Sequence, residues 1–494
     1  MSTTIVPPTT GTSLAAQATP AELWQKGFDV YQQSEDFWKP FEGTRKNAPI
    51  VVKRDTSKGA GHTINIRNMA GFYMPPKMGD QTFTSASDFE KAKITDYQLT
   101  IDVLRHATSW TENAEEKMGI RGELDAGLNE ELGKWYGREK THKLFMMFLH
   151  LGTAANTYYI NNKSSRDALV STDTLDVDSI TGAGVRLKRL NGRPAMVGTD
   201  ASGNSIYKYC VAATTDALFS LKKDSDYKQQ ARDAGERGSR NLLFKGGYHE
   251  LDGQVIKEYN PIDHDGDGPI GSPINPKADL GIAITSGTTQ IDITGGGNAT
   301  AAALTSILYY RDFPEYAYAF RTGESVTPAG EDFYVAIVNL EGADAGKFGF
   351  YKVDTNNGNK LTIKNETGDS AGAGGRLAAA TSGVASTQVG GVQWDAAQNT
   401  DAHPEGSAVI FCNSKGVPIG RTIVLGAAAA LRGYGLHDGR RGEETDEDGF
   451  LKEVYIRGYF AQTPRLDARD RAPGFVVIEH AVEYEGISFT PTLA

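Results

Sequence analysis

Residues 111–151 constrain the fold of this chain more than any other stretch. They contain no proline, and a row of large apolar residues recurs at spacings of four, four and three: Leu124, Leu128, Leu132 and Trp135. This spacing places the row on one face of an α-helix. An apolar run at residues 144–149 broadens the row, so we expect this end to be buried on most sides. At about 1.5 Å of rise per residue, a continuous helix would be roughly 60 Å long.

Both ends of the stretch carry helix-end signals. Thr111 can cap the start, because its hydroxyl can accept a hydrogen bond from a free backbone amide. The positive end of the helix dipole favours the acids that follow: Glu112, Glu115 and Glu116. Basic residues gather toward the other end, where Gly152 is a candidate stop: Arg138, Lys140, His142 and Lys143.

Glycines are the argument against one long helix. Five lie in the stretch, and each costs about 1 kcal/mol relative to alanine: Gly119, Gly122, Gly127, Gly133 and Gly137. Two shorter helices with a break near Gly133 or Gly137 are therefore the alternative. We favour a single bent helix, here called the spine helix, because other elements can lie across it and hold it.

The length, composition and net charge of the chain indicate which class of protein it belongs to. A chain of 494 residues has room for two to four domains, and 39% hydrophobic residues support real cores. The 56 glycines indicate many turns and loops. The net charge is -11 and no polybasic block is present, so we expect no electrostatic or sequence-specific binding of nucleic acid.

The two cysteines, Cys210 and Cys412, lie in apolar, strand-like settings and do not form a disulfide scaffold, which favours a reducing cytoplasm. No apolar run reaches membrane-spanning length, so we expect no membrane contact. Residues 1–20 lack the features of a secretory signal and are rich in threonine, proline and alanine. We interpret them as a flexible arm.

Between the arm and the spine helix, the pattern changes from helical to alternating. Residues 21–41 predict a short amphipathic helix with aromatic anchors: Trp24, Phe28, Tyr31 and Phe37. Residues 51–66 alternate around a turn-rich middle, and residues 94–103 alternate again. This pattern predicts a long hairpin over residues 51–103, either as the edge of a sheet or as an arm that rests on a neighbouring subunit.

After the spine helix, the sequence has α/β character. Residues 177–190 predict a helix with Asp176 or Asp178 near its start. The further elements expected up to the end of this part are a strand at 206–212, helices at 215–222 and 226–237, and two strands within 241–259.

The composition shifts at Pro261. Up to about residue 406 the chain is rich in glycine, alanine, threonine, asparagine and aspartate. We interpret this part as an inserted β-rich domain with strands at 290–294, 333–340, 348–353 and 361–364, the last two joined as a hairpin through 354–358. Residues 408–412 and 422–431 again have the pattern of buried α/β elements, and strands are expected after them at 452–460 and 475–484.

Motifs of catalysis are sparse. The sequence has no G-x-S-x-G, Walker, H-E-x-x-H or C-x-x-C motif, and His106 and His142 have no acidic or cysteine partner nearby in sequence. The acidic run at 443–448 predicts a solvated loop. We therefore expect no enzyme.

The strongest chemical pattern lies at residues 263–268. Asp263, Asp265 and Asp267 alternate and are followed by glycine, an arrangement that can wrap calcium with oxygen ligands. Ile274 stands where a calcium loop has its glutamate. A solvated Asp/Gly-rich turn explains the pattern as well, so a calcium site and a plain turn both stay open.

Several segments, taken in order, resemble the Hong Kong 97-type capsid fold of tailed phages. Within that fold, they are similar to the major capsid family typified by coliphage N-four. The segments that carry the resemblance are 54–61 with 63–66, 101–107, 216–221 with 234–244, and 420–425 with 427–430. The resemblance covers roughly residues 45–260 and 415–490, and the block from 261 to 406 has no counterpart in it.

The resemblance implies an α+β fold with an N-terminal arm, an extended hairpin loop, a long spine helix, and peripheral and axial domains. The division of the chain is then as follows: arm 1–50, extended loop 51–105, spine helix and peripheral domain 106–204, first axial part 205–260, inserted β-rich domain 261–406, second axial part 407–448, and peripheral strands 449–494.

The resemblance also implies a function without catalytic residues. A major capsid protein assembles with copies of itself into hexamers and pentamers of an icosahedral head that encloses double-stranded DNA, is built in the host cytoplasm and ends in the virion. Portal, scaffold and decoration proteins are further candidate partners. Two alternatives stay open: an encapsulin-like compartment shell, and a β-rich adhesion or decoration protein.

Basic residues on the long hairpin are the candidate contacts between subunits. Arg54, Lys58 and Arg67 lie on this segment, whereas the chain as a whole is acidic. We expect them to pair with carboxylates of a neighbouring copy.

Overall fold

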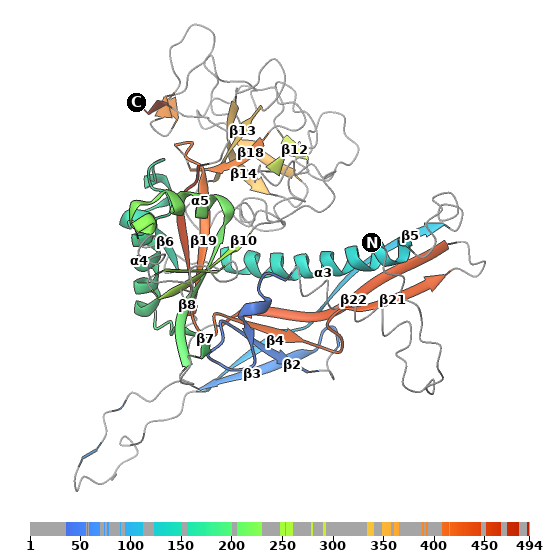
Figure 1. Ribbon diagram of the computed structural model, residues 1–494. Helices are drawn as coiled ribbons and strands as arrows, with labels where there is room; N and C mark the ends of the chain where they lie inside the picture. The colour runs from blue at the N-terminus through green and yellow to red at the C-terminus, as the bar shows by residue number, and fades with distance from the viewer. Residues whose placement is uncertain are drawn as a thin grey trace, which may run out of the picture.

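The computed structural model describes residues 36–111 with gaps between 56 and 93, 123–150, 156–199, 205–229, 248–259 without 252, 415–445 without internal gaps, 451–465 and 472–483. It also describes short strands and adjoining residues between 278 and 413, and residues 492–493. Two large mixed sheets are joined by a long helix, and a third sheet lies beside one of them (Figure 1).

The first large sheet has seven strands, and its central strands are enclosed. Its order is β6 (Thr157–Tyr159), β23 (Phe475–Ala481), β19 (Ile419–Leu425), β8 (Ser205–Thr214), β10 (Gln254–Tyr259) and β9 (Tyr248–Leu251), with β7 (Ala195–Thr199) paired to β8. Every residue of β19 and β23 is buried, as expected of strands covered on both faces. Helices α4 (Val177–Arg189) and α5 (Thr215–Lys223) pack against this sheet (Figure 1).

Most sequence predictions for this part are confirmed. Helix α4 has the expected cap, because the Asp176 carboxylate accepts a hydrogen bond of 2.7 Å from the Ser179 amide. Helix α5 and strand β8 lie where they were expected, and β9 and β10 form the expected antiparallel pair. Residues 225–229 are helical, and the rest of the helix expected at 226–237 lies outside the described residues.

The second large sheet has six strands. They are β1 (Glu42–Gly43), β2 (Ile50–Arg54), β20 (Ala430–Tyr434), β22 (Leu451–Pro464), β21 (Arg440–Thr445) and β5 (Asp102–Thr111). The second half of β22 pairs with β20, and its first half pairs with β5 and β21. Strands β5, β22 and β21 therefore form a three-stranded ribbon, referred to below as the ribbon (Figure 1).

The hairpin is shorter than the sequence predicts. Strands β3 (Thr63–Met69) and β4 (Ile94–Thr100) pair in antiparallel register, but β2 pairs in parallel with β20. The prediction that residues 51–52 form one leg of the hairpin is therefore wrong. The reason is burial, because Ile50 is fully buried in the core and Val51 packs beneath the second sheet.

The base of the hairpin packs onto the six-stranded sheet. Ile64 of β3 and Leu99 of β4 are 2% exposed and join Ile101, Leu431 and Ala461 in one apolar cluster. The hairpin is therefore attached to its own subunit at its base (Figure 1).

The spine helix is one continuous helix, α3 (Glu123–His150). It passes through Gly133 and Gly137 without a break, so the alternative of two helices is wrong. It begins at Glu123, however, and Thr111 ends β5 by pairing with Leu451 instead of capping the helix. Cross-strand pairing at Thr111 prevails over its capping propensity.

Two apolar contacts hold the spine helix. Leu132 and Tyr136 pack on Val454 and Ile456 of β22. The broad apolar end is buried as expected, since Leu144, Phe145 and Phe148 join the main core with Phe37, Trp38 and Phe475. No helix in the described part of the chain is long and apolar enough to cross a membrane.

The third sheet belongs to the inserted block. Its order is β11 (Ala278–Asp279), β18 (Ala408–Cys412), β13 (Phe333–Val338), β14 (Phe348–Asn356), β15 (Lys360–Lys364) and β12 (Gln290–Asp292). The expected hairpin of β14 and β15 is confirmed. Residues 408–412 pair with β13, so the insert continues to Cys412 and does not end at 406.

Two further expectations need correction. Residues 440–445 form strand β21, so the first part of the acidic run is paired with β22 and is not a loop. The strands near the C-terminus are also distributed between the two large sheets differently from the expected division into axial and peripheral parts. Strand β20 joins β22, whereas β23 joins β19. Which sheet a strand joins depends on main-chain pairing between segments far apart in the sequence, and local patterns do not predict such pairing.

Candidate functional site

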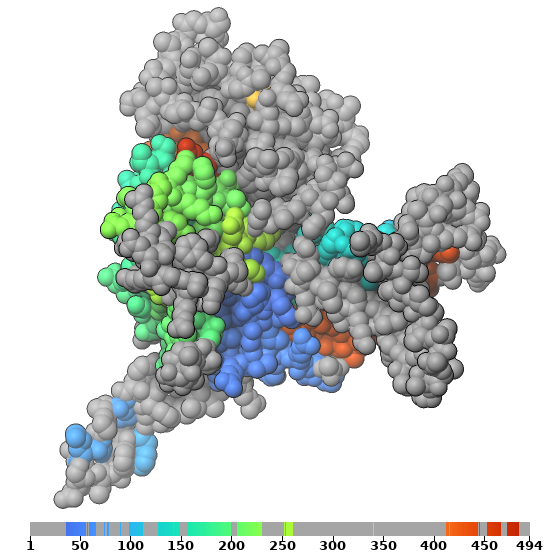
Figure 2. Space-filling view, in the orientation of Figure 1, coloured from blue at the N-terminus to red at the C-terminus, as the bar shows by residue number. Residues whose placement is uncertain are grey.

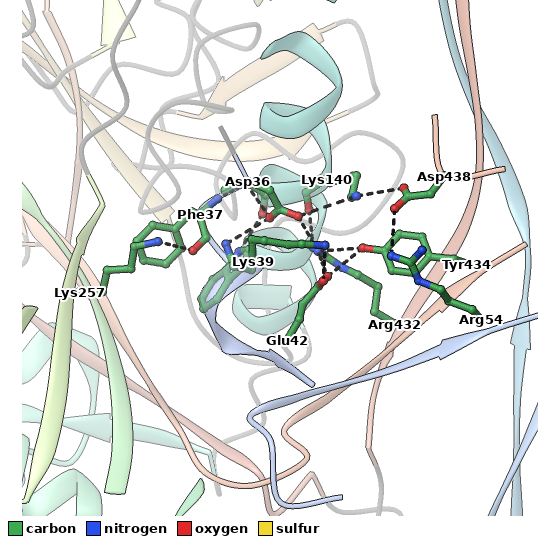
Figure 3. Close-up of polar contacts among 12 residues, drawn as sticks. Asp36, Phe37, Lys39, Glu42, Arg54, Lys140, Lys257, Arg432, Tyr434 and Asp438 are labelled. Carbon is green, nitrogen blue, oxygen red and sulfur yellow. Dashed lines mark hydrogen bonds and ion pairs between the residues drawn. The ribbon is translucent and has the colours of Figure 1, made fainter. Parts of the chain in front are cut away.

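A cluster of charged side chains is buried where the first described residues meet the spine helix (Figure 3). We call it the anchor cluster, and its members are Asp36, Glu42, Lys140, Arg432, Tyr434 and Asp438. The surface of the first described residues, blue in Figure 2, lies between the green surface of the seven-stranded sheet region and the orange surface of β22. The anchor cluster therefore lies where several parts of the chain converge.

Arg432 is the centre of the anchor cluster. Its side chain is fully buried, and its Nη1 donates to Asp36 Oδ2 at 2.9 Å and to Glu42 Oε1 at 2.6 Å. Its Nη2 donates to the backbone carbonyl of Lys140 at 3.2 Å. The Tyr434 hydroxyl donates to the same Glu42 oxygen at 2.8 Å. One guanidinium thus joins β20, the spine helix and the segment before β1.

Lys140 adds a second cation from the spine helix. Its ammonium lies 3.1 Å from Asp438 Oδ1 and 3.9 Å from Asp36 Oδ2. The rings of Tyr434 and Tyr136 lie 4.7 Å and 5.4 Å from the same nitrogen, which favours a cation in this position.

The backbone around Asp36 is also fixed to the spine helix. Thr141 accepts a hydrogen bond of 3.0 Å from the Phe37 amide at its hydroxyl, and its carbonyl accepts one of 3.2 Å from the Trp38 indole. The Thr141 hydroxyl in turn donates to Asp36 at 3.4 Å. These three bonds hold residues 36–38 against the middle of the helix.

The electrostatics favour charged carboxylates in this cluster. Burial alone would raise the pKa of Glu42, but Arg432, Lys39, Lys140 and the Tyr434 hydroxyl together lower it to about 2. Burial lowers the pKa of Lys140, against the opposing effect of Asp438 and Asp36. A carboxylate held this firmly by a guanidinium is a poor general base. The arrangement is suited to holding segments together.

A second ionic group lies inside the seven-stranded sheet. Glu479 of β23 accepts from Arg166 Nη2 at 2.7 Å and Nε at 2.9 Å, and from Arg421 Nε at 3.1 Å. Burial would raise the pKa of Glu479, but these two arginines lower it to about 2. Next to it, His480 is fully buried, and burial lowers its pKa to about 4.

Sequence reasoning missed the anchor cluster. Asp36 precedes two aromatic residues, and Arg432 follows a run of alanines and a leucine. A charged residue inside an apolar stretch is a signal of a buried ion pair, because an unpaired buried charge is too costly. The sequence contains this signal at Arg432. It does not identify the partners, because they lie 292 to 396 positions away from Arg432 in the sequence.

Two of the three predicted contact residues, Arg54 and Arg67, lie in the described part of the chain. Arg54 is 60% exposed, 3.9 Å from Asp438, with its guanidinium 5.2 Å from the centre of the Tyr434 ring, so it borders the anchor cluster. Arg67 is opposite Asp96 in the β3–β4 register, and Lys58 lies outside the described residues. Asp263, Asp265 and Asp267 also lie outside them. Within the described chain, no group of three or more His, Cys, Asp or Glu side chains could hold a metal ion.

The fold has counterparts among solved structures, although no protein-family model and no curated protein matches the sequence. The capsid of Ralstonia phage GP4 is similar over 99% of this chain and 100% of that chain, with a TM-score of 0.52 and 13% identity. The capsid asymmetric unit of cyanophage Pam1 is similar over 97% and 99%, with a TM-score of 0.50 and 10% identity. The chain therefore has the α+β, Hong Kong 97-like fold of phage capsid proteins that the sequence predicts.

Proposed function

We propose that the protein is the major capsid protein of a tailed phage. Copies of it assemble into hexamers and pentamers of an icosahedral head, which encloses double-stranded DNA. The head is assembled in the host cytoplasm, and portal, scaffold and decoration proteins are its further partners. Within the capsid proteins, the segments quoted above favour the family typified by coliphage N-four.

One observation carries this proposal: the fold matches phage capsid proteins over almost the full length of both chains. The anchor cluster adds physical support. A shell subunit must carry load between copies, and a continuous helix fixed by buried ion pairs to a sheet and to the first described residues makes a stiff frame. The absence of a polybasic block also suits an inner surface that must release DNA.

Particle assembly tests the proposal. The purified protein, raised in concentration and followed by sedimentation and electron microscopy, should form closed shells of uniform size. Particles recovered from phage-infected cells should contain DNA protected from nuclease. Closed shells that never contain DNA would instead support a compartment shell, and a protein that stays monomeric under all assembly conditions would contradict both.

The inserted β-rich domain is proposed to lie on the outer surface and to be dispensable for the core fold. Its sheet is formed within residues 278–412, and the two large sheets take no strand from it. Replacing residues 261–412 with a short Gly/Ser linker should therefore leave a folded subunit by circular dichroism. Loss of all secondary structure would refute this assignment.

Two site proposals from the sequence keep their own tests. Arg54, Lys58 and Arg67 are proposed to pair with carboxylates of a neighbouring copy. Changing Arg54 and Lys58 to Glu should weaken shells most at low salt and leave the free subunit folded. Calcium at Asp263, Asp265 and Asp267 should raise the melting temperature by binding the native state. Equal melting temperatures in chelator and in millimolar calcium would refute a calcium site at these residues.

A further inference from the structure

Like charges lie opposite one another in two rows across the ribbon, whose strands run side by side (Figure 1). In the strand register, Arg457 of β22 is directly opposite Arg105 of β5 and Arg440 of β21. Four residues away along β22, Glu453 is directly opposite Glu444 of β21. Like charges directly opposite one another destabilise a sheet, so both rows are unfavourable in the subunit alone.

Both rows lie on the face of the ribbon away from the spine helix. Val454 and Ile456 point toward that helix and pack against it. Successive side chains of a strand point to opposite faces, so Glu453, Tyr455 and Arg457 point away from the helix. The three arginines of the basic row are all exposed on this outer face.

The subunit itself does not neutralise either row. In the described part of the chain, no ion pair joins these arginines or glutamates to a side chain of opposite charge. Arg457 instead hydrogen-bonds to Tyr459, and its guanidinium lies 5.8 Å from the centre of the Tyr455 ring. A partner that presents both signs of charge would relieve both repulsions.

An uncharged row lies midway between the two charged rows. Tyr455 is opposite Ala107 of β5 on one side and Gly442 of β21 on the other. A Cβ at Gly442 would collide with the Tyr455 ring, so the ring lies over the glycine and the row stays flat. Successive rows are two residues apart, about 7 Å at roughly 3.4 Å per residue. The charged rows therefore lie at equal distances on either side of a flat, uncharged centre.

This pattern is complementary to itself. A two-fold axis along the uncharged row brings a second copy face to face with the first and exchanges the positions of the charged rows. Each basic row then meets the acidic row of the other copy. A second copy supplies both signs of charge at the right spacing by symmetry, since the same patch meets itself in a two-fold contact. The phosphates of DNA would be attracted by one row and repelled by the other.

We propose that the outer face of the ribbon pairs with the same face of a second copy about this two-fold axis. Ala107, Tyr455 and Gly442 lie on the axis, each against its own counterpart. The inference rests on the proposed function, in that it concerns how copies of a shell subunit meet. It assigns the partner, the surface and the symmetry of one contact.

Disulfide cross-linking tests the symmetry. Ala107 is exposed, so Ala107→Cys should link two copies under mild oxidation, because a disulfide needs Cβ atoms about 4 Å apart. Ser109→Cys is the matched control, exposed on the same face one row away, where the two copies are offset by about 14 Å. The native Cys210 and Cys412 are buried. Non-reducing electrophoresis should show about tenfold more linked dimer for Ala107→Cys.

Charge reversal tests the pairing of the rows. Arg105→Glu, Arg440→Glu and Arg457→Glu together should leave the circular dichroism of the free subunit unchanged. Association should fall about tenfold or more, because like charges then meet across the contact. The loss should be larger at low salt, where charges are less screened. If these reversals destabilise the subunit, the three Gln variants remove the charges without reversing them.

Two further variants complete the charge test. Glu444→Lys with Glu453→Lys should lose association in the same way. An equal mixture of this variant with the arginine reversals should regain it, because each copy then meets opposite charges in both rows. The control for net charge replaces three exposed lysines elsewhere with glutamate and should associate normally: Lys188, Lys222 and Lys228.

The inference and the proposed function can fail separately. Shells of the unmodified protein together with equal cross-linking of the two cysteine variants, or normal assembly of both charge variants, would overturn the inference alone. Failure of the mixture to regain association would also overturn it. Normal shells that lose nuclease-protected DNA on arginine reversal would assign the basic row to nucleic acid instead. Selective cross-linking of Ala107→Cys in a protein that forms no shells would support the inference and contradict the proposed function.

Discussion

The two large sheets of this protein are covered in different ways. In the seven-stranded sheet, every residue of β19 and β23 is buried, and α4 and α5 pack against it. The six-stranded sheet is less enclosed. The spine helix covers one face of the ribbon, but five residues of β5 are exposed: Asp102, Arg105, His106, Ala107 and Ser109. One sheet is completed by its own chain, and the other leaves a face for contacts.

The charged groups also differ between the two regions. Glu479 in the seven-stranded sheet is enclosed by Arg166 and Arg421, so these three buried charges have partners of opposite sign. In the ribbon, by contrast, Arg457 of β22 lies directly opposite Arg440 of β21 and Arg105 of β5, which makes a row of three exposed arginines. Arg432 of the same six-stranded sheet is paired in the anchor cluster, so the contrast lies between buried charges such as Glu479 and Arg432, which have partners of opposite sign, and the exposed arginines of the ribbon. This is the arrangement expected of a subunit that is stable alone and completed by other copies.

The largest expected effect is at the junction of the two regions. Replacing Arg432 with Met leaves Asp36 and Glu42 buried without their main partner, and breaking a buried ion pair from one side costs about 3–5 kcal/mol. Chemical denaturation should show this loss. Arg54→Met is the control, because its side chain is 60% exposed and such pairs contribute about 0–1 kcal/mol. Equal effects of the two changes would show that the anchor cluster does not hold the subunit together.

The contact between the spine helix and the ribbon should be nearly as sensitive. A Cβ at Gly458 would lie 1.8 Å from the Tyr136 hydroxyl, so Gly458→Ala must displace the helix or the strand. Overpacking of this kind costs about 3 kcal/mol at the upper end of its usual range. Gly127→Ala in the same helix meets nothing within 4 Å and should instead stabilise by up to about 1 kcal/mol. Two melting curves shifted in the same direction would contradict this geometry.

As the pH falls, the seven-stranded sheet should begin to lose stability at a higher pH than the anchor cluster does. Burial lowers the pKa of His480 from 6.5 to about 4. Below pH 6.5 the unfolded chain therefore takes up a proton that the native chain does not, and stability falls as the pH drops toward 4. At pH 5 the loss should be about 2 kcal/mol. Glu42 and Glu479, with pKa values lowered to about 2, add a further loss only between about pH 4.5 and 2. Denaturation of His480→Gln should lack the first loss and keep the second.

The smallest effect is expected on the open face of the ribbon. Arg457→Gln removes one charge from the row and should raise the stability of the free subunit by up to about 0.5 kcal/mol at low salt. The gain should vanish at high salt, where exposed charges are screened. A lower melting temperature at low salt would mean that Arg457 has a stabilising partner within its own subunit.

The sequence predicted the enclosed region better than the open one, for a physical reason. Strands β8, β10 and β23 and helix α4 are recognisable because burial imposes local patterns and local caps, as at Asp176. Errors arose where distant pairing decides, as for β2, which joins β20 in parallel, and for Thr111, which pairs with Leu451.

The ionic clusters and the arginine row were beyond local patterns altogether. Arg432 meets Asp36 across 396 positions, and the row of arginines exists only once the register of three strands is fixed. The charged residues of the hairpin are visible in the sequence because they lie within one segment. A local pattern contains no information that places residues from three strands side by side.

Hydrogen–deuterium exchange on free subunits and on assembled particles tests the central claim most directly, because it reports each sheet separately. The account predicts that amides of β5 and β21 gain protection on assembly, whereas those of β19 and β23 are already protected in the free subunit and stay unchanged. Unchanged exchange in β5 and β21, together with a gain in β19 and β23, would show that the seven-stranded sheet is completed by other copies and would contradict the account.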